Sequence, residues 1–353
     1  MHKYTIIRAD ASNEIGTGHI MRCLVLADEL KQNHLETVFV CRNLPGNLSD
    51  YINQRGYRVF SRYTHPLSPD DMEKDASYTI QVIHNIGRLP EWTIIDHYAI
   101  GEKWELLVRA HTCKILVIDD LANRRHHADI LLDQNLAENA ELRYMGLVPE
   151  SCRLLLGPSY LLLRPIFLNE RRNLRQRTGE IRRLLVFFGG SDSTNETEKA
   201  LDALIRLRPN IEVDVIVGQT YEYRAGIQQK CLLLGRANLH IQVENMANFI
   251  ASADFALGAG GISMWERCYL GLPSAITIVA DNQKDSVCLA ERLGAVWKTG
   301  YHNEINSSHY ADILYRAMNS PEQLVRMSSR SLDLVGSSPE SITSRVVEVM
   351  MME

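Results

Sequence analysis

Residues 4–22, YTIIRADASNEIGTGHIMR, contain the pattern that decides the fold. A short apolar run over 4–8 predicts a β-strand, and an amphipathic run over 19–32 predicts a helix. Gly16 and Gly18 stand in the loop between them, where glycine permits a tight turn and lets an anion approach the backbone. Because the N–H groups at the start of a helix carry partial positive charge, the stretch predicts an anion-binding turn at the end of a strand.

His19 opens the predicted helix. An imidazole at that position can donate a hydrogen bond to an anion or act as a base, and its pKa is easily moved across neutrality. The structural alternative, a turn whose histidine only caps the helix, carries equal weight. The dinucleotide-binding fingerprint is excluded, because its third glycine is absent and no acid stands at the end of the second strand.

The rest of the chain repeats this alternation of short apolar runs with longer amphipathic ones. Such alternation predicts parallel sheets with helices on both faces. It restarts after residue 183, so we expect an α/β protein with two doubly wound, Rossmann-like parallel-sheet domains facing each other across a cleft. The further predicted strands are 37–41, 92–96, 115–119, 184–188, 211–217, 254–257 and 273–279.

A charged segment over 169–183 interrupts the alternation. Its first half could equally form a helix, since Glu and Arg are good helix formers. We predict an N-terminal Rossmann-like domain over 1–170 that includes His19, a linker over 171–183, a C-terminal Rossmann-like domain over 184–335, and a C-terminal helix within 336–353.

The composition excludes several classes of protein. The 353 residues carry 38 Lys and Arg against 43 Asp and Glu, and this net charge of −5 is a poor basis for binding nucleic acid or an anionic membrane. No apolar run approaches the about 18 residues of a membrane span, and the N-terminus lacks a signal-peptide pattern. The seven cysteines are scattered without a CxxC motif or zinc spacing, so we expect a cytoplasmic protein without a metal site.

A second glycine loop occurs at 258–266, GAGGISMWE. Ser263 and Glu266 have the spacing of a capping box, which is the structural interpretation of these two residues. The functional interpretation places a diphosphate on the loop amides, including those of Gly261 and Ile262, and lets Glu266 accept hydrogen bonds from a ribose. We favour function, because four consecutive small residues are more than a cap requires.

Three further polar stretches are candidates for the same site. Ser191, within GGSDSTN at 189–195, either donates to the same phosphates or belongs to an N-capped helix start, at equal weight. The stretches 96–98, DHY, and 119–120, DD, offer acceptors for sugar hydroxyls or amides, although Asp at strand ends also forms turns. The stretch 281–285, DNQKD, is a polar helix start whose structural interpretation is simple capping.

Five segments of the sequence resemble one family. GTGHIMRC (16–23) and GAGGISMWERCYLGLP (258–273) are the most specific, and IDDLANRRHHADILLDQN, GPSYLLLRPIF and FFGGSD support them. Together they resemble the UDP-sugar hydrolases of pseudaminic acid biosynthesis, the PseG family, which is related to the MurG transferases and the spore-coat polysaccharide proteins. The similarity runs from about residue 5 to about residue 295. It implies a GT-B fold, with UDP on the C-terminal domain and the sugar in the cleft.

The resemblance also implies an activity. This is hydrolysis of UDP-2,4-diacetamido-2,4,6-trideoxy-β-L-altropyranose to UDP and the free sugar, in the nonulosonic acid pathway that serves flagellin glycosylation or surface glycans. No cofactor is implied, and other enzymes of that pathway are possible partners. The alternative is a MurG-like or spore-coat-type glycosyltransferase that passes the sugar from UDP to an acceptor.

The resemblance assigns roles residue by residue. His19 matches the essential histidine, Ser263 and its neighbours match the phosphate loop, and Glu266 matches the ribose acceptor. Asn282 matches a residue facing the sugar, and Val243 with its neighbours would offer backbone groups to the uracil.

We expect water to attack the anomeric carbon with inversion. His19 is then either the base that takes the proton from water or a donor to the diphosphate. The sequence has no DxD motif, which agrees with metal-independent chemistry. Asp10, Tyr98 and Asn282 are candidates to orient the water or the sugar.

Overall fold

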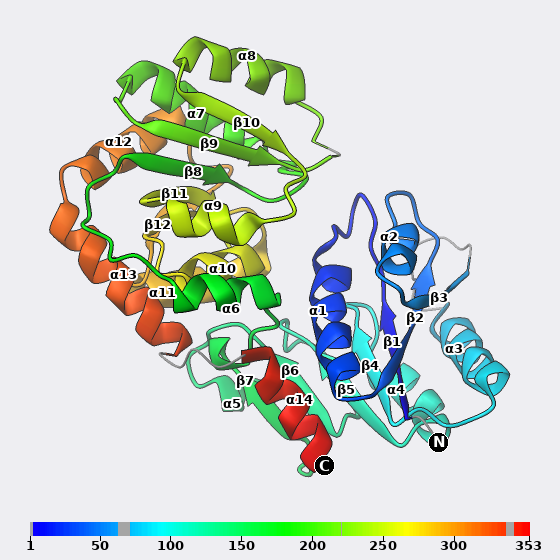
Figure 1. The fold of residues 1–353 in the computed structure, drawn as a ribbon. Coiled ribbons are helices and arrows are strands. Elements are labelled where there is room, and N and C mark those ends of the chain that lie inside the picture. Colours follow the sequence, from blue (N-terminus) through cyan, green and yellow to red (C-terminus); the bar gives the residue numbers. More distant parts are fainter. Residues whose placement is uncertain (1–2, 63–70, 220, 337–341) are drawn as a thin grey trace. The chain divides into compact units, whose positions relative to one another are not determined.

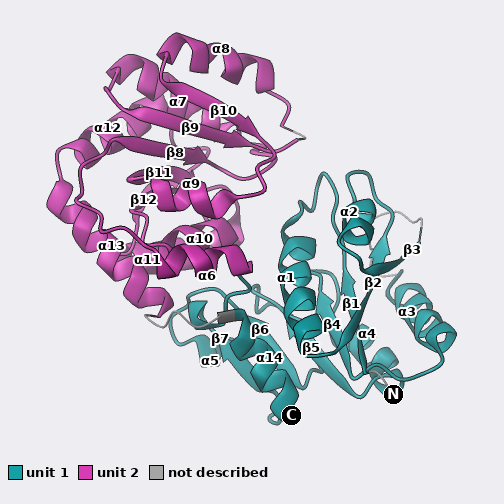
Figure 2. Cartoon of the chain, in the orientation of Figure 1, with its two compact units in different colours: residues 1–163, 341–353 teal, residues 164–340 magenta. Residues whose placement is uncertain are grey.

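The chain forms two compact units, each built on one parallel sheet (Figures 1 and 2). Unit 1 comprises residues 1–163 and 341–353, and unit 2 comprises residues 164–340. The prediction of two doubly wound, Rossmann-like domains is therefore confirmed. The structure, a computed structural model, describes residues 3–62, 71–219, 221–336 and 342–353.

The sheet of unit 1 has seven strands in the order β3-β2-β1-β4-β5-β6-β7, with every neighbouring pair parallel. The central strands β1 and β4 are buried along their whole length, as their β-branched sequences YTIIRA and WTIID require. The strands are β1 (Tyr4–Ala9), β2 (Glu36–Arg42), β3 (Arg58–Arg62), β4 (Trp92–Asp96), β5 (Lys114–Ile118), β6 (Ile130–Asp133) and β7 (Arg153–Leu156).

Helices cover both faces of this sheet (Figure 1). The helices α1 and α14 pack on each other and share one apolar core with the sheet, whereas α3 and α4 belong to the core on the other face. The helices of unit 1 are α1 (Gly18–Gln32), α2 (Ser49–Gln54), α3 (Met72–Ile86), α4 (Glu102–Val108), α5 (Ala140–Arg143) and α14 (Ile342–Met352), with 3-10 turns at Arg109–His111 and Pro158–Tyr160.

The sheet of unit 2 has six parallel strands in the order β10-β9-β8-β11-β12-β13. Its strands are β8 (Arg183–Phe187), β9 (Glu212–Val217), β10 (Ala237–Ile241), β11 (Phe255–Ala259), β12 (Ser274–Ile278) and β13 (Trp297–Tyr301). Its helices are α6 (Pro165–Arg172), α7 (Glu196–Leu207), α8 (Arg224–Leu234), α9 (Met246–Ser252), α10 (Ile262–Tyr269), α11 (Lys284–Arg292), α12 (Ser307–Met318) and α13 (Pro321–Val335), with a 3-10 turn, η4, at Asp281–Gln283.

The order of strands reverses once in each sheet. In unit 1 the chain runs outward from β1 to β3 and then returns to place β4 on the other side of β1. In unit 2 the same reversal puts β11 beside β8. Ligands of doubly wound sheets bind outside the carboxyl ends of the strands at such a reversal. The glycine loops over 10–18 and 258–261 lie at these two points.

The division between the units differs from the predicted boundaries. The chain leaves unit 1 after Leu163, and the segment predicted as a linker, 171–183, lies inside unit 2. Arg175 and Arg177 of that segment donate to backbone carbonyls of α9 and the residues that follow it, and Arg175 also pairs with Asp254. The charge of this segment therefore fastens it to unit 2.

The C-terminal tail returns to unit 1. Of the residues predicted to form a terminal helix, 342–352 form α14, whereas 337–341 lie outside the described residues. Thr343 accepts a hydrogen bond from the backbone N–H of Leu163 at 2.9 Å, and Ser344 donates to Glu29 of α1 at 2.6 Å.

A buried network of ion pairs fixes the carboxyl end of β1. Arg8 donates two hydrogen bonds to Asp10, at 2.6 and 2.9 Å, and two to Asp75 of α3, at 3.0 and 2.9 Å. The indole N–H of Trp104 in α4 donates to Asp75 at 2.9 Å. Arg8 is 1% exposed, so the network ties β1 to the helices on one face of the sheet without help from solvent.

Replacing Arg8 by methionine should destabilise the protein by about 3 to 5 kcal/mol, because it leaves two buried carboxylates without their main partner. Urea unfolding followed by circular dichroism measures the loss. The matched control is Lys3→Met, which removes an exposed pair with Glu91 and should cost at most about 1 kcal/mol. Equal losses in the two variants would contradict the importance of the network.

Candidate active site

His19 lies in the first turn of α1, directly after the loop that follows β1. Gly16 has a φ of +79°, and a Cβ added at Gly16 or Gly18 would meet nothing within 4 Å. Ser12 holds the loop by accepting hydrogen bonds from the backbone N–H groups of Glu14 and Ile15, at 3.2 and 2.9 Å. The loop therefore reaches the start of α1 with open space beside both glycines.

The imidazole of His19 does not serve as a cap; it pairs with an acid at the end of β4. Its Nδ1 lies 2.6 Å from Oδ1 of Asp96, which is fully buried. Arg22, one turn further along α1, donates to both carboxylate oxygens of Asp96, each at 2.6 Å. Burial alone would raise the pKa of Asp96, but Arg22 and then His19 hold it well below its usual range.

Two groups lie close to Nδ1 of His19: Oδ1 of Asp96 at 2.6 Å and, further away, Nη2 of Arg22 at 3.2 Å. The shorter contact favours the tautomer with the proton on Nδ1. A carboxylate can only accept, so Nδ1 of His19 carries the proton that is shared with Asp96. In the neutral ring, Nε2 is then left as the acceptor, which is the state of a general base. Sequence reasoning considered Asp96, within the stretch 96–98, only as an acceptor for the sugar, and it did not single out Arg22, although Arg22 lies in the quoted glycine-loop stretch.

Tyr98 lies against His19. The two rings meet edge to face with their centres 4.7 Å apart, and the Tyr98 hydroxyl donates to Oδ2 of Asp120 at 3.3 Å. Asp120 lies two residues after the end of β5, the neighbour of β4, so parallel pairing brings it to the same edge of the sheet. His19, Asp96, Tyr98 and Asp120 thus form one cluster at the reversal point of unit 1.

Asp10 sits deeper than the expected role in orienting substrate suggests. It is 1% exposed and accepts hydrogen bonds from Arg8, from the backbone N–H of Arg42 and, at 3.2 Å, from His97 Nε2. Burial favours the neutral acid, yet Arg8 and then His97 lower the pKa of Asp10. Its carboxylate is therefore occupied by donors from the protein.

In unit 2, the second glycine loop connects β11 to α10. Gly261 has a φ of +76° and occupies the N-cap of α10, which has no side-chain cap. Ser263 lies inside the helix and accepts from Arg267 at 3.4 Å, so the capping-box interpretation of Ser263 and Glu266 is wrong. The N-cap residue of α10 therefore offers no side chain to accept hydrogen bonds from the N–H groups of the first turn, which begins at Ile262.

A buried cation lies beneath this loop. Arg267 is 1% exposed, and its Nη2 donates to the carbonyl of Ala259 at 2.6 Å. Within the described part of the chain it forms no ion pair with a carboxylate. Burial lowers the pKa of Arg267 to about 10, which still leaves it charged at neutral pH. A Cβ at Gly258 would come within 2.8 Å of this guanidinium, so glycine is needed there.

Gln283 supports the loop from η4. Its Oε1 accepts the backbone N–H of Val279 at 3.1 Å, and a Cβ at Gly260 would meet the Gln283 side chain at 2.8 Å. Sequence reasoning singled out the stretch 281–285 but not this residue. The requirement for glycine at 260 therefore comes from packing against Gln283 as well as from access for a ligand.

Glu266 stands one turn into α10 and is partly buried. Burial raises the pKa of its carboxyl group, against the opposing charges of Arg164 and Arg267. The described residues donate no hydrogen bond to this carboxylate. It is therefore an acceptor with capacity for an outside donor.

The other predicted contacts of unit 2 follow the same edge of the sheet. Ser191 follows β8 and is exposed, whereas its neighbour Asp192 accepts from the backbone N–H groups of Glu196 and Thr197 and so supplies the cap of α7. Val243 follows β10, and Asn282 is exposed in η4 after β12. All of them lie at carboxyl ends of parallel strands, together with Gly261.

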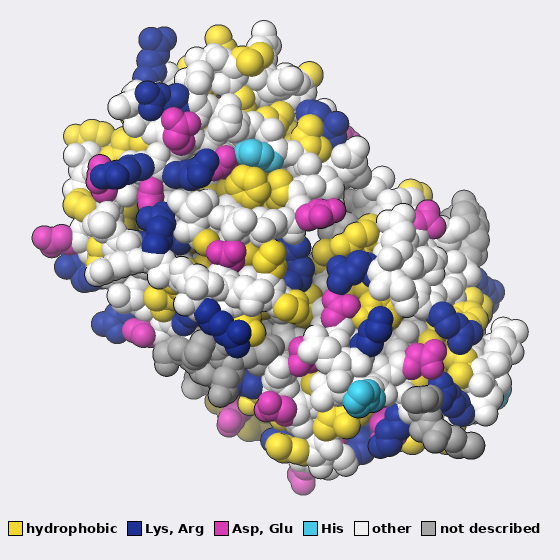
Figure 3. Space-filling model, in the orientation of Figure 1, with side chains coloured by type: hydrophobic (Ala, Val, Ile, Leu, Met, Phe, Trp, Pro, Cys, Tyr) yellow, Lys and Arg dark blue, Asp and Glu magenta, His cyan; other side chains and the backbone are white. Residues whose placement is uncertain are grey.

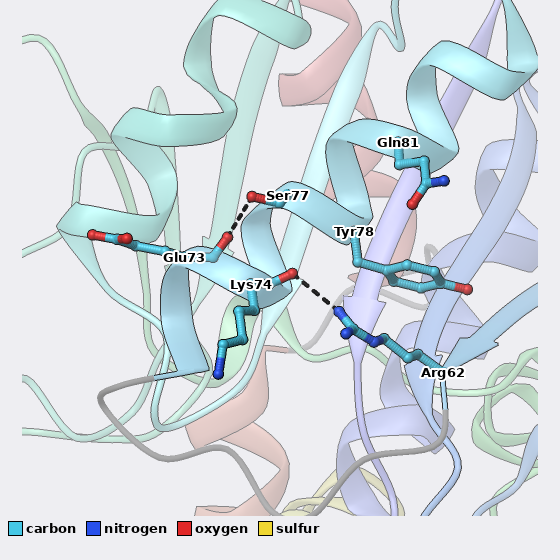
Figure 4. Close-up of a pocket in the computed structure, with 6 residues that line it drawn as sticks. All are labelled: Arg62, Glu73, Lys74, Ser77, Tyr78 and Gln81. Atoms are coloured by element: carbon cyan, nitrogen blue, oxygen red, sulfur yellow. Dashed lines mark hydrogen bonds between the residues drawn. The ribbon is translucent and has the colours of Figure 1, made fainter.

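One hollow on unit 1 contains none of these residues. It lies between β3 and α3, and Figure 4 shows Arg62 reaching over the ring of Tyr78 and donating to the carbonyl of Lys74. Its remaining lining residues are Glu73, Ser77 and Gln81. Its lining comes from β3, the edge strand two places from β1, and from α3, and we assign it no function.

Surface charge and helix length add two observations. On the face drawn in Figure 3, Lys and Arg are interspersed with Asp and Glu over both units. Among the described residues, no helix has the length and apolarity to cross a bilayer, and no three His, Cys, Asp or Glu side chains group as metal ligands would.

Comparison with known proteins gives relatives of the whole chain and of part of it. The chain is 34% identical over 191 residues to the UDP-2,4-diacetamido-2,4,6-trideoxy-β-L-altropyranose hydrolase of Campylobacter jejuni, covering 54% of this chain and 61% of that protein. It is 25% identical over 316 residues to an uncharacterized protein of Methanocaldococcus jannaschii, covering 87% and 61%. The chain therefore spans 61% of the length of each of these two relatives.

A third relative is the spore coat polysaccharide biosynthesis protein SpsG of Bacillus subtilis, 23% identical over 284 residues and 78% of each chain. No family model matches the sequence.

Solved structures identify the fold as GT-B. MurG of Acinetobacter baumannii superposes with a TM-score of 0.69 at 13% identity, over 99% of this chain and 100% of that one. HepE of Anabaena, solved in complex with UDP and glucose, superposes with a TM-score of 0.57 at 12% identity, over the full length of both chains. The GT-B expectation is confirmed.

Proposed function

We propose that this protein is a nucleotide-sugar hydrolase that cleaves UDP-2,4-diacetamido-2,4,6-trideoxy-β-L-altropyranose into UDP and the free sugar. The similarity to the Campylobacter hydrolase suggests the substrate and the reaction. The observation that carries the proposal is the 2.6 Å contact between Nδ1 of His19 and Asp96, which leaves Nε2 of His19 as an acceptor. A role in pseudaminic acid biosynthesis, and through it in flagellin glycosylation, rests on the same similarity.

His19 is proposed as the general base. It takes a proton from water as the oxygen attacks the anomeric carbon, and Asp96 stabilises the imidazolium that forms. Arg22 keeps Asp96 ionised, so the proton stays on the imidazole. Attack opposite the leaving group inverts the anomeric centre.

The diphosphate leaves as UDP. Uncapped N–H groups at the start of α10 and the buried charge of Arg267 beneath the loop provide positive potential for its phosphates. UDP is a good leaving group, so these groups can stabilise the developing charge without a strong general acid. Glu266 is proposed to accept hydrogen bonds from the ribose, with Ser191 and Ser263 near the phosphates, Val243 near the uracil and Asn282 near the sugar.

The second candidate is a glycosyltransferase that uses the same two loops and delivers the sugar to an acceptor hydroxyl. The fold similarity to MurG favours keeping it. It differs from the hydrolase in one measurable way, because a transferase without its acceptor should release little UDP.

Replacing His19 by asparagine should lower turnover by about 10²- to 10⁴-fold, the usual contribution of a general base. The assay incubates the protein with the UDP-sugar and no acceptor, and measures UDP and free sugar, which the wild type should release in equal amounts. The affinity for UDP, measured by calorimetry, should change little. The matched control is His84→Asn, because His84 lies on α3 and its ring interacts with the ring of His111.

Near-normal turnover in the His19 variant would remove its catalytic assignment. A parallel collapse of UDP affinity would favour the role of a phosphate donor. Wild-type protein that releases no UDP until an acceptor is added would support the transferase.

Replacing Glu266 by glutamine should weaken UDP binding by about tenfold, because a neutral amide accepts hydrogen bonds from ribose hydroxyls less strongly than a carboxylate. The dissociation constant for UDP measures the effect. The control in the same unit is Glu212→Gln, an exposed residue 3.5 Å from Arg236. An affinity that stays within twofold of the wild type would contradict the ribose assignment.

A further inference from the structure

Asp120 is an acid beside His19 whose charge is only partly satisfied. It lies two residues after the end of β5, and its side chain is 10% exposed. Tyr98 lies against both His19 and Asp120. Nη1 of Arg22, the residue that holds Asp96, lies 3.9 Å from Oδ2 of Asp120. One guanidinium therefore stands between the acid that orients His19 and this second acid.

The two oxygens of Asp120 differ sharply. Oδ2 accepts from the Tyr98 hydroxyl at 3.3 Å and from Nδ2 of Asn135 at 3.2 Å. Oδ1 is buried and has no hydrogen-bond partner among the described residues. Leaving a buried acceptor unsatisfied is unfavourable, and more so when the group is charged. An outside donor at Oδ1 would recover that cost.

The preceding residue, Asp119, shows what a structural acid looks like at this edge. It is fully buried, lies 2.7 Å from Arg124, and accepts from the backbone N–H of Ala122 and the hydroxyl of Tyr144. Its partners come from the protein itself. Oδ1 of Asp119 accepts no hydrogen bond either, but it lies 2.7 Å from Nη1 of Arg124. Among the described residues no cation lies as close to Oδ1 of Asp120, which stands where the strand order reverses and ligands bind.

We propose that Asp120 is a specificity-determining residue whose Oδ1 accepts a hydrogen bond from an N–H or O–H group of the substrate sugar. The inference rests on the proposed function and deepens it. The proposed sugar offers suitable donors, namely the N–H groups of its two acetamido substituents and its one free ring hydroxyl. A sugar that lacks a donor at this position leaves the carboxylate unsatisfied and binds poorly.

Burial raises the pKa of Asp120, in part opposed by Arg22 and by the Tyr98 hydroxyl, while Asp119 and Asp96 raise it further. A carboxylate that is short of donors in this way gains most from an added hydrogen bond.

Asp120→Asn tests the inference without changing the shape of the site. The two donors at Oδ2 orient the new amide so that its oxygen faces Tyr98 and Asn135, which places the NH₂ group where Oδ1 stood. The site then offers a donor in place of an acceptor. The fold should be preserved, because the hydrogen bonds at the Oδ2 position are kept.

The experiment compares kcat/KM for UDP-2,4-diacetamido-2,4,6-trideoxy-β-L-altropyranose with the inhibition constant of UDP, in the full-length protein. The Asp120→Asn variant should lose at least tenfold in kcat/KM, while inhibition by UDP stays within twofold and the melting temperature is unchanged. The control is Asp28→Asn, a partly buried acid on α1 that accepts from Arg55 and Tyr57, and it should stay within twofold in both constants. A substrate analogue whose ring hydroxyl is methylated distinguishes the hydroxyl from the two acetamido N–H groups as the donor to Asp120. The wild type should hydrolyse this analogue more slowly than the substrate only if the hydroxyl is the donor.

If wild type hydrolyses the substrate and Asp120→Asn matches it, the inference is overturned and the proposed function stands. If the variant loses UDP inhibition in the same proportion as kcat/KM, Asp120 acts on the nucleotide or the fold and the inference is again overturned. If wild type does not hydrolyse the UDP-sugar, the proposed function fails and the inference fails with it.

Discussion

The contact between Nδ1 of His19 and the carboxylate of Asp96 joins the two sides of the strand-order reversal in unit 1. His19 belongs to the helix that follows β1, and Asp96 ends the neighbouring strand β4. Arg22 holds the same carboxylate with two hydrogen bonds, so a charge that burial would otherwise neutralise stays ionised. The orientation of the imidazole and the protonation of its Nδ1 both follow from this one buried acid. Tyr98 lies against the ring that Asp96 orients, and its hydroxyl donates to Asp120.

At the strand-order reversal of unit 2, backbone geometry and a buried cation shape the candidate site. The end of β11 and the loop after it need glycine at three places for three different reasons: Gly258, within β11, lies against Arg267, Gly260 lies against Gln283, and Gly261 has a positive φ. No side chain caps the helix that follows, and Arg267 lies beneath the loop without a carboxylate partner in the described residues. An anion at this edge would meet N–H dipoles and the charge of Arg267, which forms no ion pair with a carboxylate of the described residues. In the function proposed above, this local positive potential would hold the diphosphate although the chain has a net charge of −5.

Local sequence patterns predicted most of the fold and part of the candidate site. Parallel α/β units are indicated by apolar runs such as those of β1, β4 and β12 and by the glycine loops that follow strands. These signals are local, because strand burial and helix starts depend on neighbouring residues. The four-residue β6 and the largely polar β10 give too weak a signal and were not predicted. The end of unit 1 at Leu163 depends on tertiary packing, which no local charge pattern encodes.

The site shows the same limit. Arg8 and Asp10 are two residues apart, so their side chains point to the same side of the sheet. Arg8 therefore donates to Asp10, the acid that the sequence suggested for orienting the water or the sugar. Ser263 and Glu266 are three residues apart, as in a capping box, but two residues on the same face inside a helix have the same spacing. The N-cap of α10 is Gly261, two residues before Ser263. The partnership of His19 with Asp96 spans 77 positions and could be found only by folding the chain.

The central claim is that a water molecule, activated by His19, attacks the sugar and not the phosphate. A single turnover of the UDP-sugar in ¹⁸O-labelled water, with both products examined by mass spectrometry, tests it most directly. We predict the label in the free sugar and unlabelled UDP. Label in the terminal phosphate of UDP would contradict attack at the anomeric carbon and, with it, the proposed role of His19.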